Sequence, residues 1–307
     1  DDIFNRRNEL ELDAESLRVL ERYHLDFVRA GAKLDGEERK RYAQVGERLA
    51  ELGTAFGQNV LADEQNFLLP LQESDIDGLP DFAREAASGI AKERGVDAPY
   101  AITTSRSSAE PFLQFADRRD LREKIFKALI ARGDNGNAHD NKKLIAEIVK
   151  LRAKRARLLG YSTFADYRLA DTMAETPDNA RILLDQVWTA ARSRALEERD
   201  ALQAVIAREG NNFALAAWDW RYYAEKLRKE RYDFDEAQII PFFQLDKMIE
   251  AAFDTAHRLF GLDFKERKDV PVYHPDVRVW EVTRGGNHVG LFFGDYFARP
   301  SKRGGAW

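Results

Sequence analysis

The segment from Asp35 to Gln65 carries the strongest constraint on what this chain can fold into. Its apolar residues recur at spacings of three and four, at Tyr42, Val45, Leu49, Leu52, Phe56 and Val60. Because an α-helix has 3.6 residues per turn, this spacing places all of them on one face of a single long helix. Such a helix must bury its apolar face against other elements, so the segment predicts a helical body.

Further helical segments follow, with recognisable start and stop signals. Pro80 is well placed to open a helix, and Thr176 is suited to cap one that has Pro177 in its first turn. Pro241 interrupts the last of the helical segments. The predicted helices cover residues 81–95, 117–133, 137–160, 176–210, 215–233 and 235–261.

Strand signals are concentrated at the C-terminal end. Short extended pieces are predicted at 67–72 and 98–106, and after Gly261 the pattern changes to β-branched and aromatic alternation. There, "VRVWEV", the turn "TRGGN" and "HVGLFFGDYF" predict a hairpin over residues 277–297. The expected fold is therefore mainly α, with a small antiparallel β-sheet near the C-terminus.

Composition excludes several classes of function. The net charge is −5, whereas a nucleic-acid-binding domain normally carries a concentrated positive surface. The sequence contains no cysteine, which excludes disulfides, thiol catalysis and cysteine-bound zinc, and fits a reducing compartment. No apolar run is long enough for a bilayer span and no signal-peptide core is visible, so a cytoplasmic protein without membrane partners is expected.

The residues alone reveal no recognisable active site. The sequence has five histidines but neither an HExxH nor an HxxEH zinc motif, and it has no GxSxG nucleophile elbow. Asp254 and His257 lie one helical turn apart, so they could share a metal with a distant carboxylate or form a surface hydrogen-bonded pair. His274 lies in a turn before a strand, which explains it without catalysis. The aromatic cluster over 218–223 is either a stacking platform for bases or ordinary helix packing.

Four stretches of the chain resemble the M3 family of zinc oligopeptidases. "WDWRYYAEKLRKERYDFDEAQIIPFFQLDKMIEAAFDTAHRLFGLDF" (218–264) and "YHPDVRVWEV" (273–282) look like its signature region. "GLFFGDYFARPSKRGGAW" (290–307) and "LLGYSTFADYRLADTMAETPDNARILL" (158–184) also match the family pattern. The peptidyl-dipeptidase branch looks closest, with oligopeptidase A-like members as the near competitor.

The resemblance implies a gluzincin-type peptidase with long helical lobes, a deep channel and zinc on an HExxH helix. In family order that helix comes after the "GAW" segment, so no catalytic or metal residue is assigned to this chain. We expect zinc in the parent enzyme but none bound here, and we interpret the chain as an inactive fragment whose partner is a missing C-terminal catalytic region. Residues 1–160 would form part of the N-terminal lobe, 161–261 the helical peptidase body, and 262–307 a small sheet lining the cleft.

The resemblance also implies one binding element, at Gly304, Gly305, Ala306 and Trp307. In the family, the strand leading to "GAW" offers backbone groups to an extended peptide, and short unstructured peptides are the expected ligands. Small residues suit this role because they let another backbone approach closely. The alternative is that "SKRGG" is only a turn between strands.

Two further expectations concern the chain on its own. It could instead be a stand-alone α-helical module that binds peptides without cutting them. An edge strand without neighbours exposes backbone groups and side chains such as Phe292, Phe293 and Phe297, so self-association through this region is expected.

Overall fold

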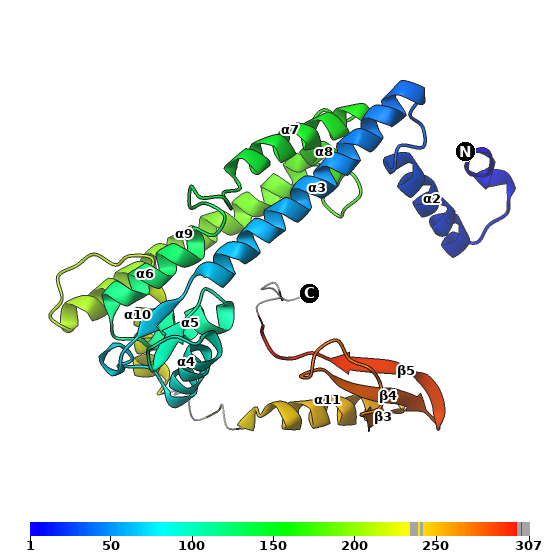
Figure 1. The fold of residues 1–307 in the computed structure, drawn as a ribbon. Helices are drawn as coiled ribbons and strands as arrows, with labels where there is room; N and C mark the ends of the chain where they lie inside the picture. The colour runs from blue at the N-terminus through cyan, green and yellow to red at the C-terminus, as the bar shows by residue number, and fades with distance from the viewer. Residues whose placement is uncertain (234–238, 240–241, 300–301, 303–307) are drawn as a thin grey trace. The chain divides into compact units, whose positions relative to one another are not determined.

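The computed structural model describes residues 1–233, 239, 242–299 and 302 of the 307-residue chain. The chain divides into two compact units: residues 1–63 with 131–200, and residues 64–130 with 201–307. The predicted division after residues 160 and 261 stays a prediction. The predicted fold class is confirmed, because helices dominate and a small antiparallel sheet lies near the C-terminus (Figure 1).

The first unit is built from helices. The long helix predicted over 35–65 is confirmed, and the Asp35 side chain caps it by accepting a hydrogen bond from the Glu38 amide at 3.1 Å. Thr176 likewise accepts from the Asn179 amide at 3.2 Å, at the helix start predicted there. The elements are α1 (Asp2–Asn5), the 3-10 turn η1 (Arg7–Glu9), α2 (Ala14–Arg29), α3 (Gly36–Asn66), α7 (Lys142–Leu158), α8 (Phe164–Leu169) and α9 (Pro177–Arg208), of which α3 and α9 continue into the second unit.

Polar contacts tie these helices together. The Tyr42 hydroxyl on α3 donates to the Arg29 carbonyl at 2.8 Å and accepts from the Arg155 guanidinium at 2.9 Å. The buried Asp63 carboxylate accepts a hydrogen bond from the Gly133 amide at 2.7 Å and another from the Asn135 side chain at 2.7 Å. These bonds fix the loop that precedes α7, since they satisfy its polar groups internally.

The second unit contains the remaining elements. β1 pairs with β2 in a two-stranded antiparallel sheet, and β3, β4 and β5 form a three-stranded antiparallel sheet in that order. The elements are β1 (Leu69–Leu71), the 3-10 turn η2 (Glu73–Asp75), α4 (Asp81–Arg94), β2 (Tyr100–Ile102), α5 (Arg106–Phe115), α6 (Arg119–Ile130), α10 (Trp220–Tyr232), α11 (Leu245–Phe260), β3 (Leu262–Arg267), β4 (Arg278–Arg284) and β5 (Asn287–Gly294).

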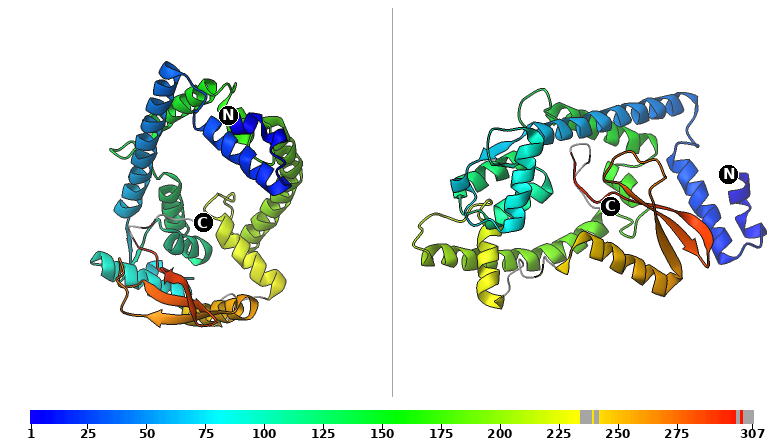
Figure 2. Two further views of the ribbon diagram at one scale, coloured as in Figure 1. Left: turned by 90° about the vertical axis from the view of Figure 1, so that its right-hand side faces the viewer. Right: turned by 60° about the horizontal axis from the view of Figure 1, so that its bottom comes forward.

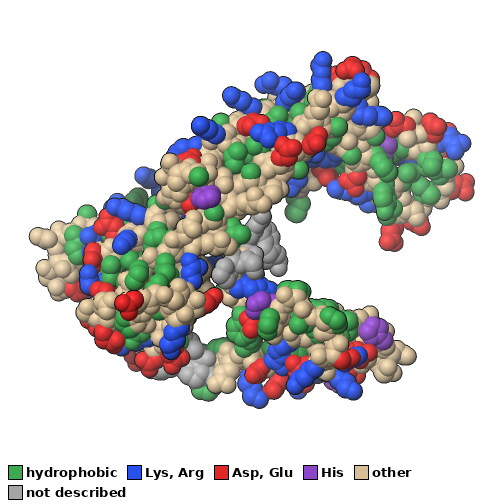
Figure 3. Space-filling view, in the orientation of Figure 1, with side chains coloured by type: hydrophobic (Ala, Val, Ile, Leu, Met, Phe, Trp, Pro, Cys, Tyr) green, Lys and Arg blue, Asp and Glu red, His purple; other side chains and the backbone are tan. Residues whose placement is uncertain are grey.

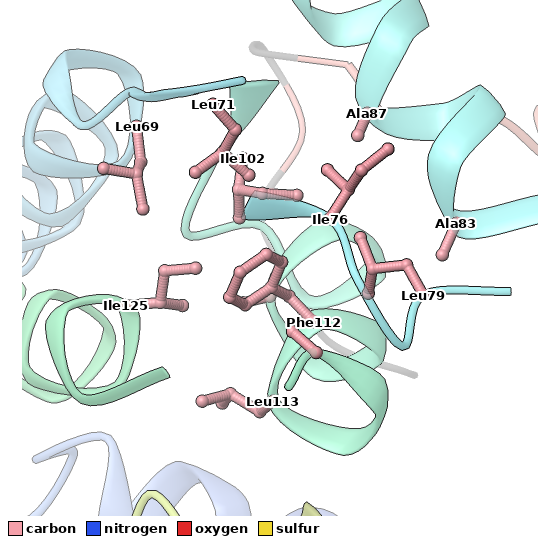
Figure 4. Close-up of a cluster of buried hydrophobic side chains, with 12 residues drawn as sticks. Leu69, Leu71, Ile76, Leu79, Ala83, Ala87, Ile102, Phe112, Leu113 and Ile125 are labelled. Carbon is pink, nitrogen blue, oxygen red and sulfur yellow. The ribbon is translucent and has the colours of Figure 1, made fainter. Parts of the chain in front are cut away.

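The main apolar core of the second unit surrounds Phe112. This side chain is 1% exposed, and Figure 4 shows leucine and isoleucine side chains from the neighbouring elements gathered around it. Burying these groups supplies the dominant favourable free energy of folding for this part of the chain. The core consists of Leu69, Leu71, Ile76, Leu79, Ala83, Ala87, Ile102, Ala109, Phe112, Leu113, Ala116 and Ile125.

A buried ion network joins α6 to α10. Asp219, which is 0% exposed, precedes α10 and accepts hydrogen bonds from Arg119 at 2.8 Å and from the buried Arg122 at 3.0 Å. Removing one partner of such a network leaves an uncompensated charge away from water, which is strongly destabilising. Beside it, Tyr222 and Tyr223 are buried against the C-terminal end of α9, so this part of the predicted aromatic cluster packs inside the fold.

The last described part of the chain, residues 242–299 and 302, is called here the C-terminal body. In both Figure 1 and Figure 2, α11 lies along one face of the β3–β4–β5 sheet. Phe253 of α11 stacks on Phe264 of β3 at 4.0 Å between ring centroids and meets Trp280 of β4 edge-on at 5.3 Å. Edge-to-face and stacked aromatic pairs add to the free energy of simple burial. The predicted hairpin is confirmed, with its turn at Gly285 and Gly286, both in the left-handed region at φ 54° and 78°.

Several segments differ from the predictions. α5 was not predicted, because Pro111 lies within it and proline usually signals the end of a helix. α10 begins at Trp220 instead of 215, since the Asp219 carboxylate accepts from the Ala216 amide at 3.1 Å and holds that stretch in a turn. β5 ends at Gly294, so the predicted strand over 288–297 is three residues too long. The predicted helix over 235–261 lies partly outside the described residues, and α11 begins at Leu245.

Asp219→Ala should destabilise the second unit by about 3–5 kcal/mol, because Arg122 would keep its charge in a buried site without a partner. Urea unfolding followed by tryptophan fluorescence measures the change. Asp200→Ala is the control, since that carboxylate pairs with Arg199 while 68% exposed, and it should change the stability by less than about 0.5 kcal/mol. Equal losses in both variants would contradict the network's role.

The C-terminal body should become less stable as the pH is lowered through the acid range. Hydrogen bonding from Arg267 lowers the pKa of Asp269 to about 2, and His288 together with Arg267 lowers the pKa of Glu281. These contributions are complete above the unfolded carboxyl pKa values of about 4 and are lost as pH falls toward 2. Near-ultraviolet circular dichroism should therefore show a smaller acid-induced change in Arg267→Met than in the parent chain. Arg284→Met, exposed at the end of β4, should behave as the parent does.

Candidate functional site

The outer strand of the three-stranded sheet, β5, is the centre of the candidate site. Its register with β4 pairs Trp280 with Phe292 and Val279 with Phe293. On the other side of β5, no strand among residues 1–233, 239, 242–299 and 302 is paired with it. A strand in this position presents a row of backbone N–H and C=O groups that can pair with another extended segment.

The two faces of β5 differ. Phe292 packs toward α11, with its ring centroid 6.0 Å from that of Phe253. Successive strand residues point to opposite faces, so Leu291 and Phe293 lie on the face away from α11. These two side chains are 43% and 42% exposed, and the space-filling view shows hydrophobic side chains gathered on the surface of the C-terminal body (Figure 3). The outer strand therefore combines an unpaired edge with an exposed apolar face.

A tightly bonded group of polar side chains follows directly after β5. The Asp295 carboxylate accepts hydrogen bonds from the Arg299 guanidinium, with one of them at 2.9 Å, and from the Tyr273 hydroxyl at 3.0 Å. The Lys302 ammonium lies 2.7 Å from the same carboxylate. The positive charges of Arg299 and Lys302 hold the pKa of Asp295 well below its usual range. We call these four residues the Asp295 cluster.

The predicted peptide-binding residues Gly304, Gly305, Ala306 and Trp307 lie outside the described residues. The last described residue before them is Lys302, a member of the Asp295 cluster. The binding element therefore stays a prediction.

A hollow of about 410 Å³ between α11 and the sheet was not singled out by sequence reasoning. Its walls carry Arg278, which donates to Asp246 at 2.7 Å and to Glu266 at 2.9 Å and lies 4.8 Å from the Trp280 ring. Glu250, also in its wall, pairs with Lys247. No local motif marks this hollow because its residues come from three separate elements.

No site for a zinc ion is formed by the described residues. Zinc in proteins takes three or four nitrogen, sulfur or carboxylate ligands that converge on one point. No three His, Asp or Glu side chains do so in the part of the chain that the structure describes. These residues do not fit the metal that the resemblance implies, so no chemical step on them can be routed through it.

The Asp254–His257 pair considered from the sequence is not formed. Asp254 instead pairs with Arg258, with their atoms 2.9 Å apart, and His257 Nδ1 lies 3.0 Å from Asp263 Oδ1. Both proposals for this pair, a shared metal and a mutual hydrogen bond, are therefore wrong. His274 Nδ1 accepts from the Asp276 amide at 3.2 Å, which is the turn expected there.

Exposed apolar side chains also lie on the helices. In the first unit, α2 exposes Val19, Tyr23 and Phe27, which recur every fourth residue, and Figure 3 shows a hydrophobic patch over this helix. The N-terminal half of α9 exposes Leu184 and Trp188 by 67% and 66%. Large exposed apolar patches mark sites that contact protein, membrane or ligand. No helix in the described ranges has the length and hydropathy required to cross a membrane.

Comparison with known proteins supplies the family. The family model described as peptidase family M3 matches residues 112–307. The dipeptidyl carboxypeptidase of Escherichia coli (strain K12) is 39% identical over 310 aligned residues, which cover 100% of this chain and 46% of that protein. Oligopeptidase A of the same organism is 35% identical over 288 residues, covering 92% of this chain and 42% of that protein.

The extent of these matches matters for function. The chain spans about half the length of the curated relatives that it matches, so their names describe longer proteins. The matched residues contain all four stretches that carried the sequence resemblance, and that resemblance is confirmed. This chain belongs to peptidase family M3.

Proposed function

We propose that this chain is the peptide-binding, non-catalytic portion of a zinc-dependent M3 metallopeptidase that hydrolyses short peptides. The enzyme would be a peptidyl-dipeptidase or an oligoendopeptidase, in keeping with the names of the two kinds of relative. The observation that carries this proposal is the family match over 112–307, which includes β5 and the segment that follows it. The described residues offer no metal site, so catalysis is assigned to polypeptide outside this sequence.

Peptide binding would occur by strand addition near the C-terminal end of the chain. Residues 304–307 supply the backbone groups in this proposal, and two glycines and an alanine among them leave room for a second backbone. The unpaired outer edge of β5 supports this mode of binding. α11 packs on one face of the sheet that contains β5, so the strand that carries this edge is held in place. Main-chain bonds would give an affinity that tolerates different peptide sequences.

The partner of this chain, in our proposal, is the rest of an M3 enzyme. More than half of each relative lies outside the portion that aligns with this chain. The exposed apolar residues Ile182, Leu183, Leu184, Val187 and Trp188 on α9 offer that polypeptide a surface to bury. The alternative, a stand-alone module that captures peptides without cutting them, shares the binding site and differs only in lacking this partner.

The isolated chain should bind a short unstructured peptide saturably and should not hydrolyse it when zinc is supplied. An internally quenched fluorescent peptide measures cleavage, and its anisotropy measures binding. The double variant Gly304→Val/Gly305→Val should weaken binding by about tenfold or more, because its side chains block the approach of a second backbone. Gly53→Val is the matched control, since an added Cβ at Gly53 on α3 meets nothing within 4 Å.

Each part of the proposal can fail separately. Zinc-dependent turnover by the isolated chain would contradict the non-catalytic assignment. Equal peptide affinity in the double variant and the parent would contradict the binding site at 304–307. Turnover restored by adding the unaligned portion of the Escherichia coli dipeptidyl carboxypeptidase would favour the peptidase fragment over the stand-alone module.

We also expect the isolated chain to self-associate through the outer edge of the sheet. Leu291→Lys places a charge on the exposed face of β5 and should shift the chain toward monomer in light scattering, because edge charges oppose strand pairing between copies. Ile145→Lys on α7 is the control, at 47% exposure against 43% for Leu291. A clean monomer in the parent chain, or the same shift in both variants, would contradict this expectation.

A further inference from the structure

The loop of residues 131–141, which precedes α7, contains the only asparagine of the 307-residue sequence that a glycine follows, Asn135 before Gly136. We propose that Asn135 is a site of spontaneous hydrolytic deamidation, and that its conversion to an aspartate releases this loop from the buried carboxylate of Asp63 on α3. The product sets a second carboxylate against Asp63 at the place where an amide now donates a hydrogen bond. Neither step depends on peptide binding.

The reaction needs only the chain and water. The Gly136 amide nitrogen attacks Asn135 Cγ, so that a new carbon–nitrogen bond forms and the bond from Cγ to Nδ2 breaks. The Gly136 nitrogen loses its proton, the departing nitrogen gains one, and ammonia is released without oxidation or reduction. Water then opens the resulting succinimide ring at either carbonyl, which leaves aspartate or isoaspartate at position 135.

The local structure leaves this attack open. Gly136 has no side chain to hinder the approach of its nitrogen to the neighbouring carbonyl carbon. Asn135 and Gly136 are both exposed, so water reaches the ring that forms between them. An added Cβ at Gly136 would meet nothing within 4 Å, which shows that no other part of the described chain covers this point of the loop.

The Asp140 carboxylate lies where the reaction requires a proton acceptor. Its Oδ2 atom accepts a hydrogen bond from the Gly136 amide at 2.9 Å, and this is the proton that must be removed before the nitrogen can attack. Its Oδ1 atom accepts from the Lys142 amide at 2.9 Å, and the Lys142 ammonium donates to Oδ2 at 3.2 Å. These bonds hold the carboxylate beside the Gly136 amide, so we assign Asp140 the role of the base.

Asp63 determines what the modification does to the fold. Its carboxylate is 7% exposed and accepts hydrogen bonds from the Gly133 amide at 2.7 Å, from Asn135 Nδ2 at 2.7 Å and from Asn137 Nδ2 at 3.2 Å. Deamidation replaces the donor at position 135 with a carboxylate, and two carboxylates at such a distance repel each other where little water screens them. The loop must therefore move away from Asp63 once Asn135 is converted.

Asn137 is an internal control within the same loop. It is exposed and donates to Asp63, as Asn135 does, but Ala138 follows it. The methyl group of Ala138 hinders attack by the Ala138 nitrogen. The two asparagines therefore share their exposure and their contact with Asp63 and differ in the residue that must attack.

Peptide mapping by mass spectrometry follows the conversion in the full chain, incubated folded at neutral pH and physiological temperature. The mass gain that accompanies replacement of NH2 by OH should appear at Asn135 at least about tenfold faster than at Asn137. Asp140→Asn keeps the shape of the side chain and removes the base, so conversion should slow by about tenfold or more. Asp134→Asn removes an exposed charge from the same loop and is the matched control, which should leave the rate nearly unchanged.

Gly136→Ala tests the attack without altering any charge. The added methyl group has room in the folded chain, and it should slow conversion of Asn135 by about tenfold because it hinders the nitrogen. No conversion at Asn135, or equal rates at Asn135 and Asn137, would overturn the modification site. Conversion that Gly136→Ala slows and Asp140→Asn does not would overturn the role of Asp140 as the base.

The release of the loop is tested with the product side chain. Asn135→Asp should speed hydrogen exchange of the Gly133 amide, which is buried against Asp63, by about tenfold. Asn135→Ala removes the same hydrogen bond without adding a charge and should produce a smaller increase. Equal exchange in these two variants, or exchange as slow as in the parent chain, would overturn the release of the loop by repulsion.

Discussion

The packing of Phe253 against the β3–β4–β5 sheet is the interaction on which the candidate site depends. A three-stranded sheet is stable only when one of its faces is covered, and α11 covers it through the stack of Phe253 on Phe264 and the edge contact with Trp280. With this face buried, the register of β5 is fixed, because a slip by one residue would turn Phe292 away from α11. The direction of the edge, and of the chain that leaves it after Gly294, follows from that register.

Ion pairs hold connections of the chain that apolar packing does not fix. Two carboxylates of the second unit, the buried Asp219 and the shielded Asp295, have similar roles at different points of the chain. Each follows or precedes a regular element and accepts bonds from two basic side chains, so each holds a connection in one conformation. Both networks keep basic groups occupied within the fold, in agreement with a chain whose net charge is negative and whose expected ligand is not a nucleic acid.

Much of the fold was predictable because it is encoded in local signals. The spacing of apolar residues in α3, the cap at Thr176 and the glycine pair at 285–286 each act over a few residues, and each appears as predicted. The helix at 106–115 was missed because Pro111 gives a local signal against helix that burial of Phe112 outweighs. Local signals therefore fail where a tertiary contact decides the structure.

The candidate site shows the same limit. The hairpin could be read from alternation and its turn, whereas the Asp295 cluster could not, because Tyr273 and Asp295 are separated by two strands in the sequence. The sequence shows that Arg299 and Lys302 follow closely after Asp295. Such short spacings between acidic and basic residues are too common to predict a network of side chains. His257 and Asp254 were one helical turn apart, yet each has a different partner, so proximity along a helix did not predict pairing.

The proposed function depends above all on binding of an extended peptide through backbone hydrogen bonds. The most direct test compares a short peptide with two forms of it, each N-methylated at one of two successive amides. Backbone N–H groups along a strand point alternately toward and away from a neighbouring strand, so strand addition predicts that one methyl group weakens binding by about tenfold or more while the other has little effect. Equal affinity for all three peptides would contradict the account, because binding would then depend on side chains alone.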